Sequence, residues 1–344
     1  MEKVLLGMSG GIDSTWACRV LQEKGYEVEG VVLLLHPDAP LEKAKSAAEK
    51  LGIKLHVADY SDSFKKEVEE YFVKEYVSGR TPNPCVVCNR KIKFESLINV
   101  ADSLGIDLIA TGHYVKVEKH LGRFTVVSGE DTKKDQSYFL WQLSQEQLSR
   151  FIAPLGDAVK SDVINNVKES QLVEEISESQ EICFIPNDDY ISYLKEHLDE
   201  DGMKTAFTKG NFVDAQGNVL GKHNGIASYT VGQRKGLGIA LGKPAYVTQI
   251  RPETNEVVLG FEEDNSSKFF KVRSLNFMGM EETRGRVSCF VRPRYRSPLI
   301  PCTVDIFENS AEVVPDTLIK KPSSGQSAVF YDEEGRILFG GYIV

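Results

Sequence analysis

The chain has 344 residues, of which 41% are hydrophobic and 26% are charged, a composition typical of globular proteins. This length allows two or three domains. No apolar run approaches the roughly 20 residues that a membrane helix needs, and no basic, apolar leader opens the chain, so we expect neither a membrane span nor a secretory signal. Six cysteines are too few and too unevenly placed for a disulfide scaffold, and we expect a cytoplasmic protein.

The net charge of −9 is distributed unevenly along the chain. Residues 151–203 contain 13 acids against three lysines, whereas residues 204–251 contain seven Lys or Arg against one aspartate. Residues 268–300 contain eight basic side chains against two glutamates, and residues 80–93 contain four and no acid. Such separation suits a protein that binds a polyanion on one face, although ordinary solvated faces would explain it equally well.

The predicted elements alternate between strand and helix as far as residue 110. Apolar runs predict strands, among them the continuous run 31–35 that is typical of a buried parallel strand, and helical spacing with glycine stops predicts helices. In chain order we expect strand 3–6, helix 15–24, strand 26–35, helix 41–51, strand 54–58, helix 63–77, helix 94–104 and strand 107–110. This alternation predicts an α/β doubly wound parallel sheet, in which ligands bind beyond the carboxyl ends of the strands.

The later elements change character. We expect a hairpin at 116–130, mostly helical structure at 136–155 and one or two acidic helices at 156–182. Beyond residue 202, glycines, short β-branched runs and turn pairs replace helical periodicity, which predicts two small β-rich barrels or sandwiches that meet near residues 262–268. We therefore expect three domains, 1–200, 201–266 and 267–344.

The segment Gly7-Met8-Ser9-Gly10-Gly11-Ile12-Asp13-Ser14 joins the first strand to the first helix. Glycines permit positive φ and close approach to a ligand, and the free N–H groups of a helix start favour an anion. Asp13 would repel a phosphate unless a cation such as Mg²⁺ lay between them. The segment is neither a Walker A motif nor a dinucleotide fingerprint. It resembles the pyrophosphate loop of PP-loop ATPases, which implies cleavage of ATP between its α and β phosphates, whereas a plain glycine turn is the simpler alternative.

Three cysteines lie in segments that suggest chemistry. Cys85 and Cys88 lie among basic side chains and just ahead of a predicted helix, so we expect lowered pKa values for both thiols. The third is Cys183. A structural zinc site would need a fourth ligand, which the sequence does not offer. A redox pair of Cys85 and Cys88 would leave the glycine loop unexplained. A sulfur-transfer pair, with one thiol from residues 85–88 and the other from Cys183, suits an ATP-activated acceptor. The other three cysteines are expected to be buried: Cys18, Cys289 and Cys302.

Several short motifs, in order and over nearly the whole chain, resemble the tRNA-specific 2-thiouridylase (MnmA) family. They are the glycine loop, Thr-Pro-Asn-Pro-Cys-Val-Val-Cys-Asn at 81–89, Ala-Thr-Gly-His-Tyr at 110–114, Lys-Asp-Gln-Ser-Tyr-Phe-Leu at 134–140, Ile-Cys-Phe-Ile at 182–185, Tyr-Thr-Val-Gly-Gln-Arg-Lys-Gly-Leu-Gly-Ile at 229–239, and Arg-Tyr-Arg at 294–296.

The resemblance implies an ATP-dependent tRNA-uridine 2-sulfurtransferase. Such an enzyme adenylates the 2-carbonyl oxygen of the wobble uridine, transfers sulfur from a cysteine persulfide, and releases AMP and pyrophosphate. By this analogy Cys183 carries the persulfide and Cys88 is the partner nucleophile, and the two end as a disulfide. Asp13 belongs to the catalytic set, and ATP lies on residues 7–14 with Leu33 and Gly112.

The resemblance also implies contacts to tRNA, in part from the central domain. The uridine must leave its stack before chemistry on its base. It would lie against Asn83, Pro84 and Cys85, and aromatic and guanidinium groups would hold the anticodon loop. The remaining expected tRNA contacts are His113, Lys134, Asp135, Gln136, Arg294, Tyr295 and Gln326.

Some alternatives stay open. Some members of the family carry aspartate at the position of Cys85, and here Cys85, Cys88 and Cys183 could instead hold an iron–sulfur cluster with one open iron. His113 could be a packed histidine at a strand end. The sulfur-donor protein is not identified by the sequence. The chain could also be another PP-loop enzyme with a different acceptor, or a non-catalytic tRNA-binding protein regulated by ATP.

Overall fold

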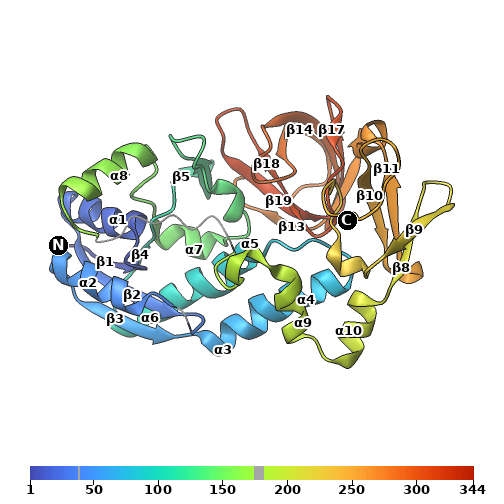
Figure 1. Ribbon diagram of the computed structural model, residues 1–344. Coiled ribbons are helices and arrows are strands. Elements are labelled where there is room, and N and C mark those ends of the chain that lie inside the picture. Colours follow the sequence, from blue (N-terminus) through green and yellow to red (C-terminus); the bar gives the residue numbers. More distant parts are fainter. Residues whose placement is uncertain (38, 174–181) are drawn as a thin grey trace.

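The computed structural model describes residues 1–37, 39–173 and 182–344 (Figure 1). An all-parallel sheet forms the N-terminal part, with strand order β3-β2-β1-β4-β7. Its strands are β1 (Lys3–Gly7), β2 (Glu27–Leu34), β3 (Leu55–Asp59), β4 (Leu108–Ala110) and β7 (Phe151–Ile152). Because these strands are parallel, the segments that follow β1, β2 and β4 lie at one edge of the sheet.

Helices cover both faces of this sheet, which confirms the predicted fold class. On one face, α1 (Ile12–Glu23), α2 (Leu41–Leu51) and α8 (Lys160–Glu169) lie together. On the other face, α6 (Glu95–Leu104) packs against Leu5 and Val31 through Leu97. The two faces are separately apolar, as a doubly wound sheet requires.

Two long helical runs contain π-helical segments. The first is α3 (Ser61–Phe64), η1 (Lys65–Glu69) and α4 (Glu70–Val77), and the second is α5 (Pro84–Cys88), η2 (Asn89–Phe94) and α6. The prediction that Cys85 and Cys88 lie ahead of a helix was wrong. They lie within α5, because Pro84 takes the first helical position, where its missing N–H costs nothing.

The region between the sheet and the β-rich part differs from the prediction. The expected hairpin is present as β5 (Val115–His120) and β6 (Arg123–Ser128). The interval 136–155 is less helical than predicted, with η3 (Ser137–Phe139) and α7 (Gln145–Arg150), because Phe151 and Ile152 pair with β4 as an edge strand. Of the expected acidic helices, α8 is present, and residues 174–181 lie outside the described residues.

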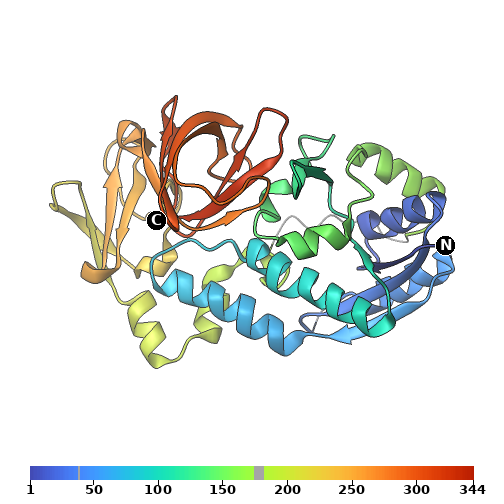
Figure 2. The same cartoon turned by 180° about the vertical axis from the view of Figure 1, so that it is seen from behind.

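The β-rich part contains an open sheet and a closed barrel (Figures 1 and 2). After η4 (Pro186–Asp188), α9 (Tyr190–His197) and α10 (Glu200–Phe207), the open sheet has the order β10-β11-β8-β9, with β8 (Gly210–Val213), β9 (Val219–His223), β10 (Tyr246–Arg251) and β11 (Glu256–Gly260). The short helices η5 (Ile226–Ser228), η6 (Pro252–Thr254) and η7 (Glu262–Asn265) and the strand pair β12 (Ser266–Ser267) and β17 (Ile319–Lys320) complete this region.

The barrel has the order β13-β16-β15-β14-β18-β19. Its strands are β13 (Phe270–Phe277), β14 (Gly285–Arg292), β15 (Ile300–Ile306), β16 (Ser310–Pro315), β18 (Ser327–Tyr331) and β19 (Ile337–Ile343). The expected β-rich C-terminal third is confirmed, although α10 continues to residue 207. The domain boundaries stay predictions, and the first of them falls at the start of α10. No helix in the described ranges is long and apolar enough to cross a bilayer.

Buried polar contacts attach the barrel to the N-terminal part. The Trp141 indole donates to Ser327 Oγ (3.0 Å), and the Tyr138 hydroxyl donates to the Ser327 carbonyl (2.7 Å). Arg292 pairs with Asp135 at 2.6 Å, and only 13% and 1% of the two side chains are exposed. This ion pair joins the turn at 134–136 to β14.

Removal of the Arg292 guanidinium should destabilise the protein strongly. In Arg292→Met the Asp135 carboxylate stays buried without its counter-charge, which costs about 3–5 kcal/mol in unfolding free energy. Urea unfolding measures this loss. Arg286→Met is the matched control, because Arg286 pairs with Asp305 at the exposed surface of the same barrel and its removal should leave stability nearly unchanged. Equal unfolding midpoints for the two variants would contradict the role of the buried pair.

Candidate active site

The glycine loop lies between β1 and α1 at the carboxyl edge of the sheet. Gly10 has φ +70°, and a Cβ there would lie 2.2 Å from the Lys43 carbonyl carbon, so only glycine fits between the loop and α2. Gly11 is the N-cap of α1 and provides no side chain to cap it. The first N–H groups of α1 are therefore not occupied by a capping side chain, as a phosphate site requires.

The other loop residues have definite positions. Ser9 and Ser14 place their hydroxyl oxygens 3.3 Å apart, and Ser14 also donates to the Gly11 carbonyl (3.2 Å). Met8 and Ile12 are buried, and the Met8 N–H donates to the Val31 carbonyl (2.8 Å). The predicted nucleotide residues Gly7 and Leu33 lie at the same edge, because Gly7 is the last residue of β1 and Leu33 is the second-last residue of β2.

Asp13 has two partners that the sequence analysis did not identify. Lys160, on α8, donates to Asp13 Oδ1 at 2.6 Å, and the Tyr114 hydroxyl donates to the same oxygen at 2.7 Å. Lys160 is a buried lysine, with a side chain only 9% exposed. Lys160 is one of three lysines among 13 acids in residues 151–203, but that composition does not identify Asp13 as its partner. The structure thus places an ammonium group of the protein beside Asp13, and the Mg²⁺ expected there stays a prediction.

The segment after β4 meets the glycine loop at very short range. A Cβ at Gly112 would lie 2.8 Å from the Asp13 carbonyl carbon and 2.9 Å from the Ser14 nitrogen. The next residue, His113, bonds Thr111 Oγ1 through Nδ1 (2.7 Å) and its ring faces Phe94 at 6.2 Å. Burial, with a smaller effect of Lys93, lowers the pKa of His113 to about 3, so the imidazole is neutral at working pH.

Lys93 lies among the three cysteines that the sequence singled out. Burial alone would lower the pKa of Lys93. The electrostatic effects of Cys88, Cys183 and Cys85 raise it, and the net pKa lies above the usual value. The positive charge of Lys93 also contributes to the lowered pKa of His113. It follows Cys88 by five residues, within a π-helical segment in which residues five apart lie on one face. Sequence analysis counted Lys93 only as one of four cations in a basic run.

The expectation of lowered thiol pKa values was wrong. Burial raises the pKa of Cys88 to about 12, and it also raises the pKa values of Cys85 and Cys183, with Lys93 opposing the shift in all three. The positive charge of Lys93 lowers the thiol pKa values, as expected, but desolvation of the thiolate raises them by more. Cys88 is buried, whereas Cys85 and Cys183 reach solvent. The expected burial of Cys18, Cys289 and Cys302 is confirmed.

The barrel holds the segment that carries Cys85 and Cys88. Gln326 donates to the carbonyls of Thr81 (3.0 Å) and Pro82 (2.9 Å), and the Thr81 N–H donates to the Ser324 carbonyl (2.8 Å). Asn83 and Pro84 are buried beside it. The barrel and the N-terminal part thus bring four of the predicted tRNA contacts close together: Asn83, Pro84, Cys85 and Gln326.

The turn at 134–136 and the barrel segment at 294–295 also meet. The Tyr295 ring lies 6.0 Å from the Tyr138 ring. Burial raises the pKa of Tyr295, and the positive charge of Lys134 opposes this shift. Asp135 is 2% exposed and accepts from Ser137 and Arg292, so its carboxylate fixes the turn rather than facing solvent. Gln136 likewise accepts from the Tyr114 N–H (3.0 Å). Arg294 donates to the Lys321 carbonyl (2.7 Å), and burial lowers its pKa.

A series of neighbouring residues connects the glycine loop with the thiols. The glycine loop lies against Gly112, and Gly112 is followed by His113. Lys93 contributes to the lowered pKa of His113, and the three thiols raise the pKa of the same lysine. Within the described ranges, no group of three or more His, Cys, Asp or Glu side chains is arranged to hold a metal ion.

Comparisons with known proteins cover the whole chain. Three family models match in order: a tRNA methyl transferase HUP domain at 2–187, a tRNA methyl transferase PRC-barrel domain at 193–261 and an aminomethyltransferase β-barrel domain at 267–344. A looser likeness is to a crystal structure of a 4-thiouridine synthetase–RNA complex with bound ATP. At TM-score 0.38 and 18% identity, over 57% of this chain and 50% of the other, that likeness carries no argument.

Curated relatives match over almost their full length. The chain is 44% identical, over 99% of its length and 98% of theirs, to tRNA-specific 2-thiouridylase MnmA 1 of Clostridium botulinum (strain Okra / Type B1). It is 40% identical, over 100% and 98%, to tRNA-specific 2-thiouridylase MnmA of Clostridium perfringens (strain ATCC 13124). The chain belongs to the MnmA family of tRNA-specific 2-thiouridylases.

Proposed function

We propose that this protein is an ATP-dependent tRNA-uridine 2-sulfurtransferase that forms 2-thiouridine at the wobble position. The observation that carries the proposal is the approach of a helix-start phosphate loop to three thiols and one lysine, through Gly112 and His113. Methyl transfer, the reaction named in two family-model descriptions, would use neither feature. Full-length relatives named as 2-thiouridylases support the same choice.

The first step is adenylation of the uridine. ATP would lie on residues 7–14 with Gly112 and Leu33, so that its phosphates face the N–H groups of α1. The uridine 2-carbonyl oxygen attacks the α-phosphorus and pyrophosphate leaves. Mg²⁺ would be held by Asp13 together with the phosphates, and it would offset their charge. The Lys160 ammonium adds a second positive charge at the same carboxylate.

The second step is sulfur transfer. A persulfide on Cys183 attacks C2 of the adenylated base and AMP leaves. Cys88 then attacks the Cys183 sulfur, which releases 2-thiouridine and leaves a Cys88–Cys183 disulfide for an external thiol to reduce. Lys93 would favour the thiolates that both attacks require. The persulfide sulfur comes from a donor protein that neither the sequence nor the fold identifies.

The tRNA would be held from two domains. Asn83, Pro84 and Cys85 would line the extruded uridine, and Lys134, Arg294 and Tyr295 would contact the anticodon loop, where cationic and aromatic groups suit phosphates and unstacked bases. His113 would lie beside the base as a neutral imidazole. We assign Asp135, Gln136 and Gln326 to positioning, because their side chains hold protein segments.

The iron–sulfur alternative does not fit the described residues as well. Cys183 contributes to the raised pKa values of Cys85 and Cys88, so the three thiols are near one another. The described part of the chain nevertheless contains no group of three or more His, Cys, Asp or Glu side chains that could hold a metal ion. No step of the proposed reaction uses a cluster. Iron and sulfide analysis after anaerobic purification distinguishes the two chemistries, since the persulfide route predicts full activity in iron-free protein.

The product test uses ATP, Mg²⁺, a sulfur donor and unmodified tRNA, followed by digestion and mass spectrometry for 2-thiouridine. Wild type should form it, whereas Cys88→Ser and Cys183→Ser should form none, since each lacks a thiolate that the transfer requires. Cys302→Ala, in the barrel, is the control and should stay active. Full activity of Cys88→Ser would refute its role, and absence of pyrophosphate release in wild type would indicate a binding protein only.

The raised thiol pKa values predict slow alkylation. At pH 8 the free enzyme's Cys85 and Cys183 should react with iodoacetamide more slowly than a cysteine peptide, and the rates should still rise above pH 9, because a raised pKa moves thiolate formation to higher pH. Lys93→Met should slow both reactions further, by about tenfold. Lys91→Met, which removes an exposed lysine paired with Glu67, should not. Equal rates in the two variants would contradict the role of Lys93.

Lys160 should matter for nucleotide binding. Lys160→Met leaves the Asp13 carboxylate facing the phosphates without its ammonium partner, and ATP affinity measured by calorimetry should fall by about tenfold or more. Lys168→Met, at the exposed end of the same helix, is the control. Thermal unfolding of both variants shows whether the protein stays folded at the assay temperature. Unchanged affinity in a folded Lys160→Met would remove Lys160 from the site.

A further inference from the structure

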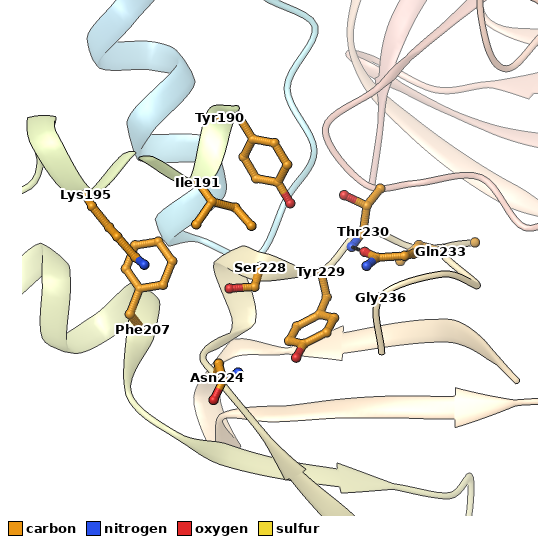
Figure 3. Close-up of a pocket in the computed structure, with 12 residues that line it drawn as sticks. Tyr190, Ile191, Lys195, Phe207, Asn224, Ser228, Tyr229, Thr230, Gln233 and Gly236 are labelled. Atoms are coloured by element: carbon orange, nitrogen blue, oxygen red, sulfur yellow. Dashed lines mark hydrogen bonds between the residues drawn. The ribbon is translucent and has the colours of Figure 1, made fainter. Parts of the chain in front are cut away.

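A hollow lies between α9 and the segment 224–236 of the central region. It has a volume of about 720 Å³, a size typical of small-ligand pockets. Figure 3 shows Tyr190 and Lys195, from α9, above Tyr229 and Asn224 from the central region. We call this hollow the α9 pocket. None of the expected nucleotide, thiol or tRNA residues lines it.

The α9 pocket offers a fixed aromatic surface. Tyr190 is half-buried, and its ring stacks on Tyr76 at 4.6 Å with an interplanar angle of 20°. On the same wall, the Lys195 ammonium lies over the Phe207 ring at 5.4 Å. A ring that is already held in place loses little freedom when a base stacks against it, and any base can stack because each has a π-face.

Positive charge lies at the rim of the α9 pocket. Arg234 and Lys235 are both exposed and follow the lining residue Gln233. Gln233 accepts from the Thr230 N–H (3.0 Å) and donates to the Lys235 carbonyl (3.0 Å), which fixes the turn that carries them. No ion pair of Arg234 or Lys235 is present among the described residues. These two cations therefore remain available to phosphates.

The rim is continuous with residues that we assign to tRNA contact. Ser323 donates to the Val231 carbonyl at 3.0 Å. A Cβ at Gly232 would lie 3.2 Å from an Arg294 guanidinium nitrogen, so the lining residue Gly232 lies close to the Arg294 side chain. An RNA strand held by Arg294 thus has the α9 pocket beside it.

We propose that the α9 pocket holds an unpaired nucleotide of the bound tRNA other than the target uridine. Its base stacks against Tyr190, and its phosphates face Arg234 and Lys235. This proposal rests on the proposed function, because it takes tRNA as the substrate. The proximity of the pocket to Arg294, which we assign to tRNA contact, favours a nucleotide over a peptide as the occupant.

The test measures tRNA affinity without chemistry. Arg234→Ser/Lys235→Ser and, separately, Tyr190→Leu should each weaken binding of unmodified tRNA about tenfold. The matched control is Lys222→Ser/Lys243→Ser, which removes the same charge from the same region at cations already partnered by Asn211 and Glu263. The charge variants lie at the surface, so they test the proposal even if Tyr190→Leu disturbs folding.

A base-by-base scan locates the nucleotide. Abasic substitution at one unpaired tRNA position should lower wild-type affinity about tenfold and should have no further effect in Tyr190→Leu. If both pocket variants bind tRNA as the control does, the proposal is wrong, even though wild type forms 2-thiouridine. Unchanged tRNA affinity with loss of thiolation only when sulfur comes from a donor protein would assign the pocket to that protein instead. Absence of 2-thiouridine in wild type is a separate failure, that of the proposed function.

Discussion

The close approach of Gly112 to the first turn of α1 is the constraint on which the site depends. A side chain at residue 112 would collide with the backbone of Asp13 and Ser14, at 2.8 and 2.9 Å. Because β1 and β4 are neighbours in a parallel sheet, this contact brings the end of β4 to the glycine loop. His113 follows at once, and Lys93 acts on it from the helix that carries Cys85 and Cys88. The contact at Gly112 therefore connects the glycine loop, through His113 and Lys93, with the surroundings of the thiols.

The same geometry sets the chemistry of the thiols. Their surroundings favour the neutral form, and Lys93 supplies the opposing charge. A thiol with a raised pKa is a poor nucleophile at neutral pH, so we expect slow alkylation even of Cys85 and Cys183, which reach solvent. The lysine nevertheless lies where a thiolate would form. The site thus combines protection of the sulfur with a fixed charge that stabilises its reactive state.

Local patterns in the sequence were sufficient for much of the fold and for part of the site. The glycine loop and the alternation of elements are encoded by neighbouring residues, so both could be predicted. The partnership of Lys160 with Asp13 joins residues 147 positions apart, and no local pattern shows it. The sign of the thiol pKa shifts failed for a related reason: the basic run at 80–93 is visible in the sequence, whereas the burial that outweighs it arises only when Cys88 joins the core formed with Phe72 and Phe184.

The barrel positions two segments of the N-terminal part. Its turn at 323–326 donates and accepts bonds with Thr81 and Pro82, and a Cβ at Gly325 would lie 2.9 Å from the Thr81 carbonyl oxygen. That turn therefore sets the position of the segment that leads into Cys85 and Cys88. Arg292, through Asp135, fixes the turn that carries Lys134. Because the barrel holds both segments by polar contacts, it sets the position of the cysteine segment and of the turn at 134–136 together, so the proposed tRNA contacts and the proposed chemistry depend on the same set of contacts.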